Sequence, residues 1–220
     1  GSTGGWKEKT SSDSSYVPVN SDSIEDAKNK GIDVSKAYVR DSEVTWLTNQ
    51  FLYDLIQPYV HEANKNAGWN FDWDLTEDFQ FTKYGLNQFY GWHTDCSDEP
   101  YQLFDPNIHP IHKNADGTPF VDQFGDFVPE HQMYTVSPKL VGKIRKLSCV
   151  ISLSDSSEYE GGDLRFDLGS HREDRYHVCK EIAPKGSIVV FPSFVYHQVT
   201  PVTSGTRYSL VCWNLGKPFR

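Results

Sequence analysis

A histidine and an aspartate stand two positions apart in an aromatic stretch of this 220-residue chain. The stretch, residues 84–95, is typical of a short aromatic strand, a Gly/Asn turn and a second aromatic strand that ends in His93-Thr94-Asp95. Residues i and i+2 of a strand point to the same face, so His93 and Asp95 would present an imidazole and a carboxylate side by side. These are two of the three ligands of the 2-His-1-carboxylate triad, which binds non-haem Fe(II) and leaves coordination positions open.

This pair alone is weak evidence for a metal site. With eight histidines and 30 acidic residues, about one such pair is expected by chance. His171-Arg172-Glu173 supplies a second one. An alternative in which the pair has no role, as in a jelly-roll binding module, therefore stays open at this point.

The last third of the chain offers a third ligand and a buried cation. His197 follows an apolar run and a Pro turn, and Arg207 opens the predicted strand 207–213 ten residues later. Period two places four residues on one face of that strand: Arg207, Ser209, Val211 and Trp213. A guanidinium is always charged and costly to bury unpaired, so an inward Arg207 predicts a bound anion such as a dicarboxylate. The alternative is an arginine that pairs with a surface acid.

The elements that would position these residues are mostly strands. After Gly68, Gly/Pro turns separate runs that are typical of strands: 78–84, 88–93, 143–153, 163–167, 187–191, 197–202 and 207–213. Before Gly68, apolar spacing predicts a support helix from Asp41 or Ser42 to about Asn66, with a break or kink near Gln57 because Pro58 lacks a backbone donor. The fold expected is mainly β with N-terminal helices and a double-stranded β-helix (jelly-roll) core.

The domain organisation follows from composition. Residues 1–23 are predicted to form an irregular N-terminal arm along the body, followed by a short helix from Ser23 to Lys30 and a single domain over 24–220. The segment at about 96–141 carries six prolines that break regular structure. We interpret it as a long inserted loop that forms a lid over the metal site.

Charge and cysteine usage exclude other classes of function. The formal net charge of −9 argues against a nucleic-acid partner, because Lys and Arg drive that binding, and the basic cluster in 139–146 is interpreted as a solvated strand edge. The four cysteines form no CxxC pair, which argues against a zinc site or disulfides and favours a reducing cytoplasm. The chain contains no apolar run of membrane-spanning length, and its Gly-Ser start without Met leads us to expect part of a longer product.

Taken together, these blocks resemble the 2-oxoglutarate/Fe(II) dioxygenases, specifically the prolyl 4-hydroxylase-like branch with its bacterial and phage PKHD-type members. The resemblance covers roughly 39–213. Besides residues 84–95, four blocks carry it: Tyr159-Glu160-Gly161-Gly162-Asp163-Leu164-Arg165-Phe166, Pro184 to Pro192, His197 to Val202, and Gly205-Thr206-Arg207-Tyr208.

The resemblance implies a role for particular residues. It implies that iron is bound by His93, Asp95 and His197. It also implies that Arg207 pairs with the distal carboxylate of 2-oxoglutarate, that Tyr84 hydrogen-bonds this cosubstrate, and that Trp213 lines the pocket near the metal. Strand geometry adds Ser209 as a further cosubstrate contact. The chain departs from some members at Val211, where they carry a Thr.

The activity implied is hydroxylation of a C–H bond with O2, releasing succinate and CO2, with ascorbate as a candidate reductant. Because Asp95 is a carboxylate, no position is vacant for a halide, which favours hydroxylation over halogenation. Tyr90, Trp92 and Trp213 would form aromatic walls suited to a proline ring, so we expect a prolyl residue of a protein or peptide as substrate. A free amino acid or other small metabolite is the alternative, and nucleic-acid demethylation is disfavoured by charge. No membrane partner is expected.

Overall fold

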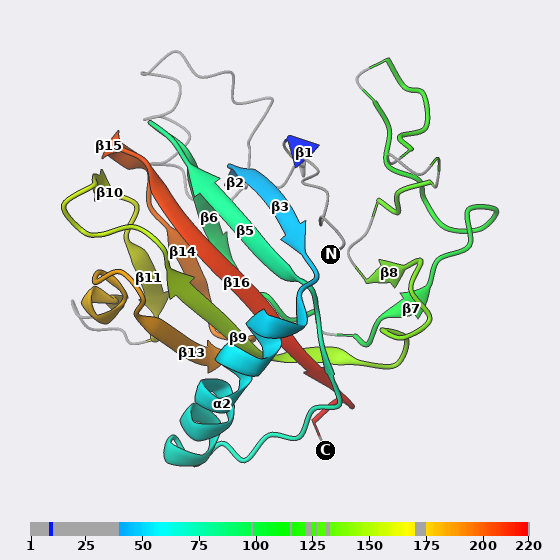
Figure 1. Ribbon diagram of the computed structural model, residues 1–220. Coiled ribbons are helices and arrows are strands. Elements are labelled where there is room, and N and C mark those ends of the chain that lie inside the picture. The colour runs from blue at the N-terminus through cyan, green and yellow to red at the C-terminus, as the bar shows by residue number, and fades with distance from the viewer. Residues whose placement is uncertain are drawn as a thin grey trace.

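The computed structural model describes residues 9–10, 40–97, 99–114, 116–121, 125, 127–130, 133–169 and 175–219. Two antiparallel sheets share one core, to which Tyr84, Val150 and Phe191 of the larger sheet and Leu164 and Phe166 of the smaller sheet contribute (Figure 1). This arrangement confirms the predicted mainly β fold with a double-stranded β-helix core.

The larger sheet runs in the order β1-β3-β5-β16-β9-β13, with β4 paired to β16. Its strands are β1 (Lys9–Thr10), β3 (Glu43–Leu47), β4 (Leu75–Thr76), β5 (Phe79–Tyr84), β9 (Ile144–Ser152), β13 (Ile188–Pro192) and β16 (Arg207–Gly216). The smaller sheet runs in the order β12-β11-β14-β6-β2. Its strands are β2 (Arg40–Asp41), β6 (Phe89–His93), β11 (Leu164–Asp167), β12 (Tyr176–Val178) and β14 (His197–Val199). A separate hairpin pairs β10 (Tyr159–Gly161) with β15 (Val202–Gly205).

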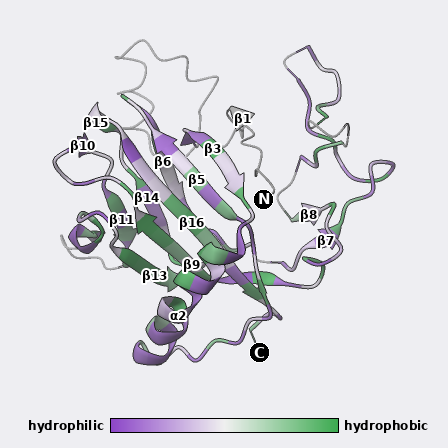
Figure 2. Cartoon of the chain, in the orientation of Figure 1, coloured by the Kyte–Doolittle hydropathy of each residue, from purple (hydrophilic) through white to green (hydrophobic). Residues whose placement is uncertain are grey.

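Period two in β9 and β16 gives the larger sheet two different faces. Leu147, Cys149 and Ile151 alternate along β9 and belong to the cluster that also contains Ile56 and Val60 of α2 (Gln50–Asn66). The intervening residues face the other sheet. Figure 2 shows hydrophobic residues concentrated in strands such as β9 and β13, whereas much of α2 is hydrophilic. Burial of each large apolar side chain contributes roughly 1.5–3 kcal/mol, which holds the helix on the sheet.

The predicted start of the support helix is wrong. Residues 43–47 form β3, paired with β5, and the helix begins only after Asn49, whose side chain accepts a hydrogen bond from the Phe51 amide. The β-branched and aromatic residues of Glu43–Leu47 suit a strand, and this non-local pairing overrides the helical spacing. The helix continues through Pro58, so the predicted break near Gln57 is not found.

Two other predictions fall largely outside the described residues. The helix expected at 23–30 lies entirely there, as does the N-terminal arm apart from 9–10, which pairs with β3. The mainly β domain therefore has α2 as its described N-terminal helix.

The Pro-rich segment leaves the sheets between β6 and β9. It carries the short parallel pair of β7 (Gln102–Leu103) and β8 (Tyr134–Thr135), and it projects to one side in Figure 1. Its role as a lid and the division of the chain into arm and domain stay predictions. No helix among the described residues is long and apolar enough to span a membrane. The four cysteines, all of them among the described residues, form no disulfide with one another.

Candidate metal centre

Two neighbouring strands bring the paired histidines together. His93 ends β6 and lies directly across the sheet from His197, the first residue of β14. Asp95 lies just beyond β6, where the backbone amides of Asp95 and Cys96 both donate to the Ser193 carbonyl, at 2.9 and 3.0 Å. This turn, anchored on the end of β13, directs the carboxylate toward the imidazoles.

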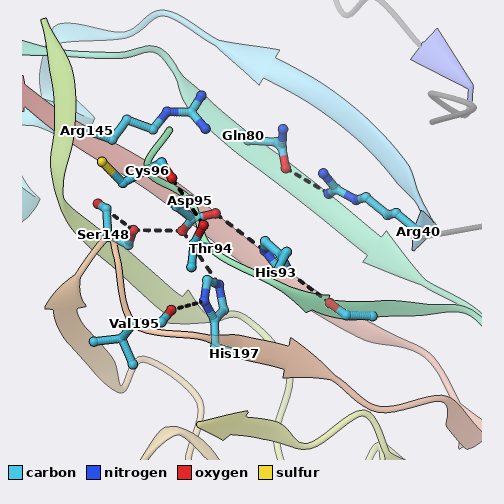
Figure 3. A network of polar contacts seen from close by, with 12 residues as sticks. Arg40, Gln80, His93, Thr94, Asp95, Cys96, Arg145, Ser148, Val195 and His197 are labelled. Carbon is cyan, nitrogen blue, oxygen red and sulfur yellow. Dashed lines mark hydrogen bonds and ion pairs between the residues drawn. The ribbon is translucent and has the colours of Figure 1, made fainter. Parts of the chain in front are cut away.

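The three side chains converge on one point (Figure 3). His93 Nε2 lies 3.4 Å from Asp95 Oδ1, and His197 Nε2 lies 3.6 Å from Asp95 Oδ2. One nitrogen or oxygen atom from each of the three residues lies within 4.8 Å of the others. Two imidazole nitrogens and one carboxylate oxygen are the donor set of a 2-His-1-carboxylate iron site, with further positions open.

Backbone carbonyls set the orientation of both rings. His93 Nδ1 donates to the Gly91 carbonyl at 2.8 Å, and His197 Nδ1 donates to the Val195 carbonyl at 2.9 Å. Because a carbonyl only accepts, each ring carries its proton on Nδ1 and offers the lone pair of Nε2 to the centre. The Nε2 atom of His93 is buried and has no hydrogen-bond partner among the described residues. A bound metal ion would satisfy this atom.

The protonation states also suit a metal ion. Burial lowers the pKa of His197 to about 4, helped by the neighbouring His93, so the ring is neutral near pH 7. Burial alone would raise the pKa of Asp95. However, His197, His93 and the Arg145 guanidinium together hold it well below its usual range, so the group stays a carboxylate.

A buried serine, Ser148, donates a hydrogen bond to the Asp95 carboxylate. Ser148 of β9 is fully buried, and its hydroxyl donates to Asp95 Oδ2 at 2.7 Å. The Ser193 hydroxyl lies 2.9 Å from the Ser148 hydroxyl. Such partners of a ligand fix its orientation and adjust its basicity.

The same cavity holds a buried guanidinium. Arg207 is 2% exposed and lines the cavity together with His93, Asp95 and His197. Its Nη1 donates to the Ser209 hydroxyl at 3.3 Å, and its Cζ lies 5.5 Å from the centre of the Tyr84 ring. No acidic side chain among the described residues pairs with Arg207, so this part of the cavity suits an anion.

A β-bulge decides which aromatic residues face the cavity. Between the pairs His197–His93 and Val199–Tyr90 the register shifts, so that β6 has one residue more than β14. Tyr90 therefore lines the cavity and stacks on the His93 ring, with the ring centres 3.5 Å apart.

Of the other two predicted aromatic walls, one lines the cavity and one does not. Trp213 lines it, and its buried Nε1 has no partner among the described residues. Trp92 is not among the lining residues, because the bulge turns it toward Tyr196 and Tyr176, at ring-centre distances of 5.4 and 5.2 Å.

Comparison with known protein families identifies the family to which the residues of this site belong. The family model described as the 2OG-Fe(II) oxygenase superfamily matches residues 79–214, from the start of β5 to near the end of β16. The chain belongs to the 2OG-Fe(II) oxygenase superfamily. Fe(II) and 2-oxoglutarate are thereby implied for this oxygenase, and both fit its side chains: the orphaned His93 Nε2 and the triad suit the metal ion, and the unpaired Arg207 suits a dicarboxylate.

Curated relatives of this oxygenase match over a limited region. A PKHD-type hydroxylase of Acinetobacter baumannii is 40% identical over 67 residues, which is 30% of this chain and 27% of the relative. A PKHD-type hydroxylase of Synechococcus sp. is 41% identical over 69 residues, which is 31% of this chain and 29% of the relative. The matches therefore span less than a third of the relatives' length.

Among crystal structures, a Pseudomonas putida prolyl-4-hydroxylase is 17% identical with a TM-score of 0.49, covering 97% of this chain and 94% of its own. The viral collagen prolyl hydroxylase of Paramecium Bursaria Chlorella virus-1 is also 17% identical, with a TM-score of 0.48 and 96% of both chains covered.

Sequence reasoning missed three side chains around the site: Ser148, Gln80 and Arg40. The first two lie on the inward face of their strands, so period two could have found them once the strands were known. Ser148 alternates with Leu147 and Cys149, and Gln80 lies in register with Val211. Arg40 reaches the cavity from a stretch bordering the predicted helix, and no local signal marks it.

Proposed function

We propose that this oxygenase is an Fe(II)- and 2-oxoglutarate-dependent hydroxylase of prolyl residues in a protein or peptide, releasing succinate and CO2. The observation that carries this proposal is the convergence of His93, Asp95 and His197 in the cavity that also buries the unpaired Arg207. The family and the names of the PKHD-type relatives support it.

We assign the following roles to the side chains. His93 and His197 hold the metal ion through Nε2, and Asp95 holds it through its carboxylate. Arg207 takes the distal carboxylate of 2-oxoglutarate, assisted by the hydroxyls of Ser209 and Tyr84. When bound, Fe(II) and 2-oxoglutarate would supply the activation of O2, the oxidant, one oxygen atom of which enters a C–H bond while the other enters succinate.

The walls of the cavity support the choice of substrate. Apolar side chains line it alongside the polar groups and restrict water: Val150, Leu164, Val199 and Val211. The rings of Tyr90 and Trp213 line the cavity and add apolar surface beside a bound proline ring. Ascorbate is the candidate reductant, and a reducing compartment such as the cytoplasm would keep the thiols and Fe(II) in the required state.

Anaerobic titration with Fe(II) and 2-oxoglutarate tests the chemistry. Chelation of iron by the keto acid gives a weak visible charge-transfer band, which we expect in the wild type and in Asp54→Ala, an exposed helix position, but not in Asp95→Ala. A folded wild type without the band would favour a non-catalytic binding module.

A second assay tests the substrate class. Succinate release that depends on a Pro-containing peptide is the expected result. Turnover of a free amino acid or other metabolite, with every Pro-containing peptide inert, would instead identify a small-molecule hydroxylase.

A further inference from the structure

A second arginine enters the cavity from the opposite sheet. Arg40 lies on β2, at the edge of the smaller sheet, and lines the cavity with the metal-facing residues. Its Nη2 donates to Gln80 Oε1 at 2.7 Å and to the Thr82 hydroxyl at 3.3 Å, and its Nε donates to the Ser42 hydroxyl at 2.6 Å. Figure 3 shows the guanidinium of Arg40 directed at Gln80 on the same side of the site as His93.

The partners of Arg40 in the described part of the chain are neutral. No acidic side chain in the described part of the chain forms an ion pair with it. Its Cζ lies 4.7 Å from the centre of the Tyr90 ring, but burial raises the pKa of Tyr90 to about 12, so this phenol is not a counter-ion near pH 7. The half-buried charge therefore has no anionic partner among the described residues.

The Arg40 guanidinium has N–H groups that make no hydrogen bond among the described residues, and its orientation is fixed. Of the five N–H groups of an arginine, three are used by Ser42, Gln80 and Thr82, which leaves both N–H groups of Nη1. The three acceptors are themselves buried. Because they hold Nε and Nη2, Arg40 is pre-organised to present Nη1 to a ligand.

The charges in the loaded cavity balance without Arg40. A divalent metal ion and Arg207 bring three positive charges, and Asp95 and the two carboxylates of 2-oxoglutarate bring three negative ones. Arg145, whose charge acts on Asp95, is neutralised by Glu77, to which it donates two hydrogen bonds of 3.0 and 2.6 Å. In this count the positive charge of Arg40 is not compensated, so the cavity can accept one further anion beside it.

We propose that Arg40 binds a carboxylate of the primary substrate, so that this oxygenase hydroxylates a substrate that carries a negative charge close to the reacting C–H bond. This inference rests on the function proposed above and narrows its substrate class. Arg40 is then a specificity-determining residue, distinct from Arg207, which serves the cosubstrate.

The position of Arg40 limits where the carboxylate stands in the substrate. The guanidinium and the metal-facing imidazole both lie close to the Tyr90 ring, whose centre is 4.7 Å from the Arg40 Cζ and 3.5 Å from the centre of the His93 imidazole. Two residues of extended chain span about 7 Å. The carboxylate therefore belongs either to the reacting residue itself, as in a free or C-terminal proline, or to an acidic side chain next to an internal proline.

The test begins with matched ligands on the wild-type protein. Under anaerobic conditions with Fe(II) and 2-oxoglutarate, the perturbation of the charge-transfer band reports substrate binding without turnover. N-acetyl-L-proline is compared with N-acetyl-L-prolinamide, and an acetylated, amidated Ala-Pro-Glu peptide with its Ala-Pro-Gln counterpart. In at least one pair the acid should bind about 10- to 100-fold more tightly than the amide, and the pair that responds identifies the source of the carboxylate.

Variants then assign the preference to Arg40. In Arg40→Gln the acid and its amide should bind equally within about twofold, whereas Arg40→Lys should keep part of the preference, because its charge remains but its fork geometry is lost. Arg165→Gln is the matched control, since Arg165 pairs with Asp163 and does not line the cavity. The affinity for 2-oxoglutarate should be unchanged in all three variants.

Three results would overturn the inference. The first is a wild type that binds neither acid more tightly than its amide. The second is a preference for the acid that survives in Arg40→Gln. The third is an Arg40→Gln variant in which 2-oxoglutarate binding is weakened as much as substrate binding, which would make Arg40 a cosubstrate contact. Failure of the proposed function is distinguishable, because the charge-transfer band would then be absent from the wild type before any substrate is added.

Discussion

Replacing Ser148 by alanine should weaken metal binding although this residue is not itself a candidate ligand. The hydroxyl donates to Asp95 Oδ2 at 2.7 Å from a fully buried position on β9. Ser148→Ala removes this donor, frees the carboxylate to rotate, and leaves the Ser193 hydroxyl without its partner at 2.9 Å. The expected result is a weaker complex with Fe(II) in an otherwise folded protein.

The magnitude follows from the bond that is lost. A hydrogen bond to a charged group contributes about 1.5–3 kcal/mol, which corresponds to a metal affinity about 10- to 100-fold lower. At a free metal concentration 100 times the wild-type dissociation constant, the ion stabilises the wild type by about 2.7 kcal/mol. A 30-fold weaker variant would gain only about 0.9 kcal/mol, so the thermal shift on adding metal should be about 4–7 °C smaller.

Anaerobic calorimetric titration with Fe(II) and thermal unfolding with and without metal measure both quantities. Ser152→Ala is the matched control, because it makes the same change at another buried serine of β9, whose hydroxyl donates to the Ser154 carbonyl. The reasoning would be refuted if Ser148→Ala bound Fe(II) as tightly as the wild type, or if Ser152→Ala lost as much affinity.

The remaining predictions concern the cosubstrate and stability. Arg207→Gln should weaken 2-oxoglutarate binding by at least about tenfold while Fe(II) alone binds normally, as separate titrations would show. Gly162→Ala should also weaken 2-oxoglutarate more than Fe(II), because the added Cβ would lie 2.9 Å from Arg207 Cδ at a backbone φ of +62°; equal losses in the two titrations would contradict this. Asn49→Ala removes the cap of α2 and should cost about 1 kcal/mol in urea unfolding without changing turnover.

Much of the fold was predictable because period two is local. The alternation along β16 sorts Arg207, Ser209, Val211 and Trp213 into the cavity, and the intervening Leu210 and Cys212 into the cluster under α2. No knowledge of the partner strands is needed for that step. Residues 43–47 could not be assigned in the same way, because their spacing also fits a helix, and only the pairing with β5 decides between the two.

The juxtaposition of His93 and Asp95 was predicted for a reason that is only partly right. The prediction placed both residues on one strand, but β6 ends at His93, and Asp95 is positioned by the Ser193 carbonyl at the end of another strand. Similarly, strict alternation could not show that Tyr90 faces the cavity while Trp92 does not, because the bulge depends on the pairing with β14. Local periodicity predicts which residues belong to the site, whereas contacts between strands determine the direction in which their side chains point.

This division has a consequence for function. The side chains proposed to bind the metal ion and 2-oxoglutarate lie on strands, or in the case of Asp95 just beyond one, whose pattern is visible in the sequence. Arg40, by contrast, is held at the cavity by hydrogen bonds to Gln80 and Thr82, which lie 40 and 42 positions away on the other sheet, as well as to the nearby Ser42. If Arg40 selects the substrate, then the residues that bind the metal ion and 2-oxoglutarate follow from local sequence patterns. The choice of substrate depends instead on contacts between the two sheets. The edge strand β2 is therefore where substitutions should change the substrate while leaving the iron and the cosubstrate in place.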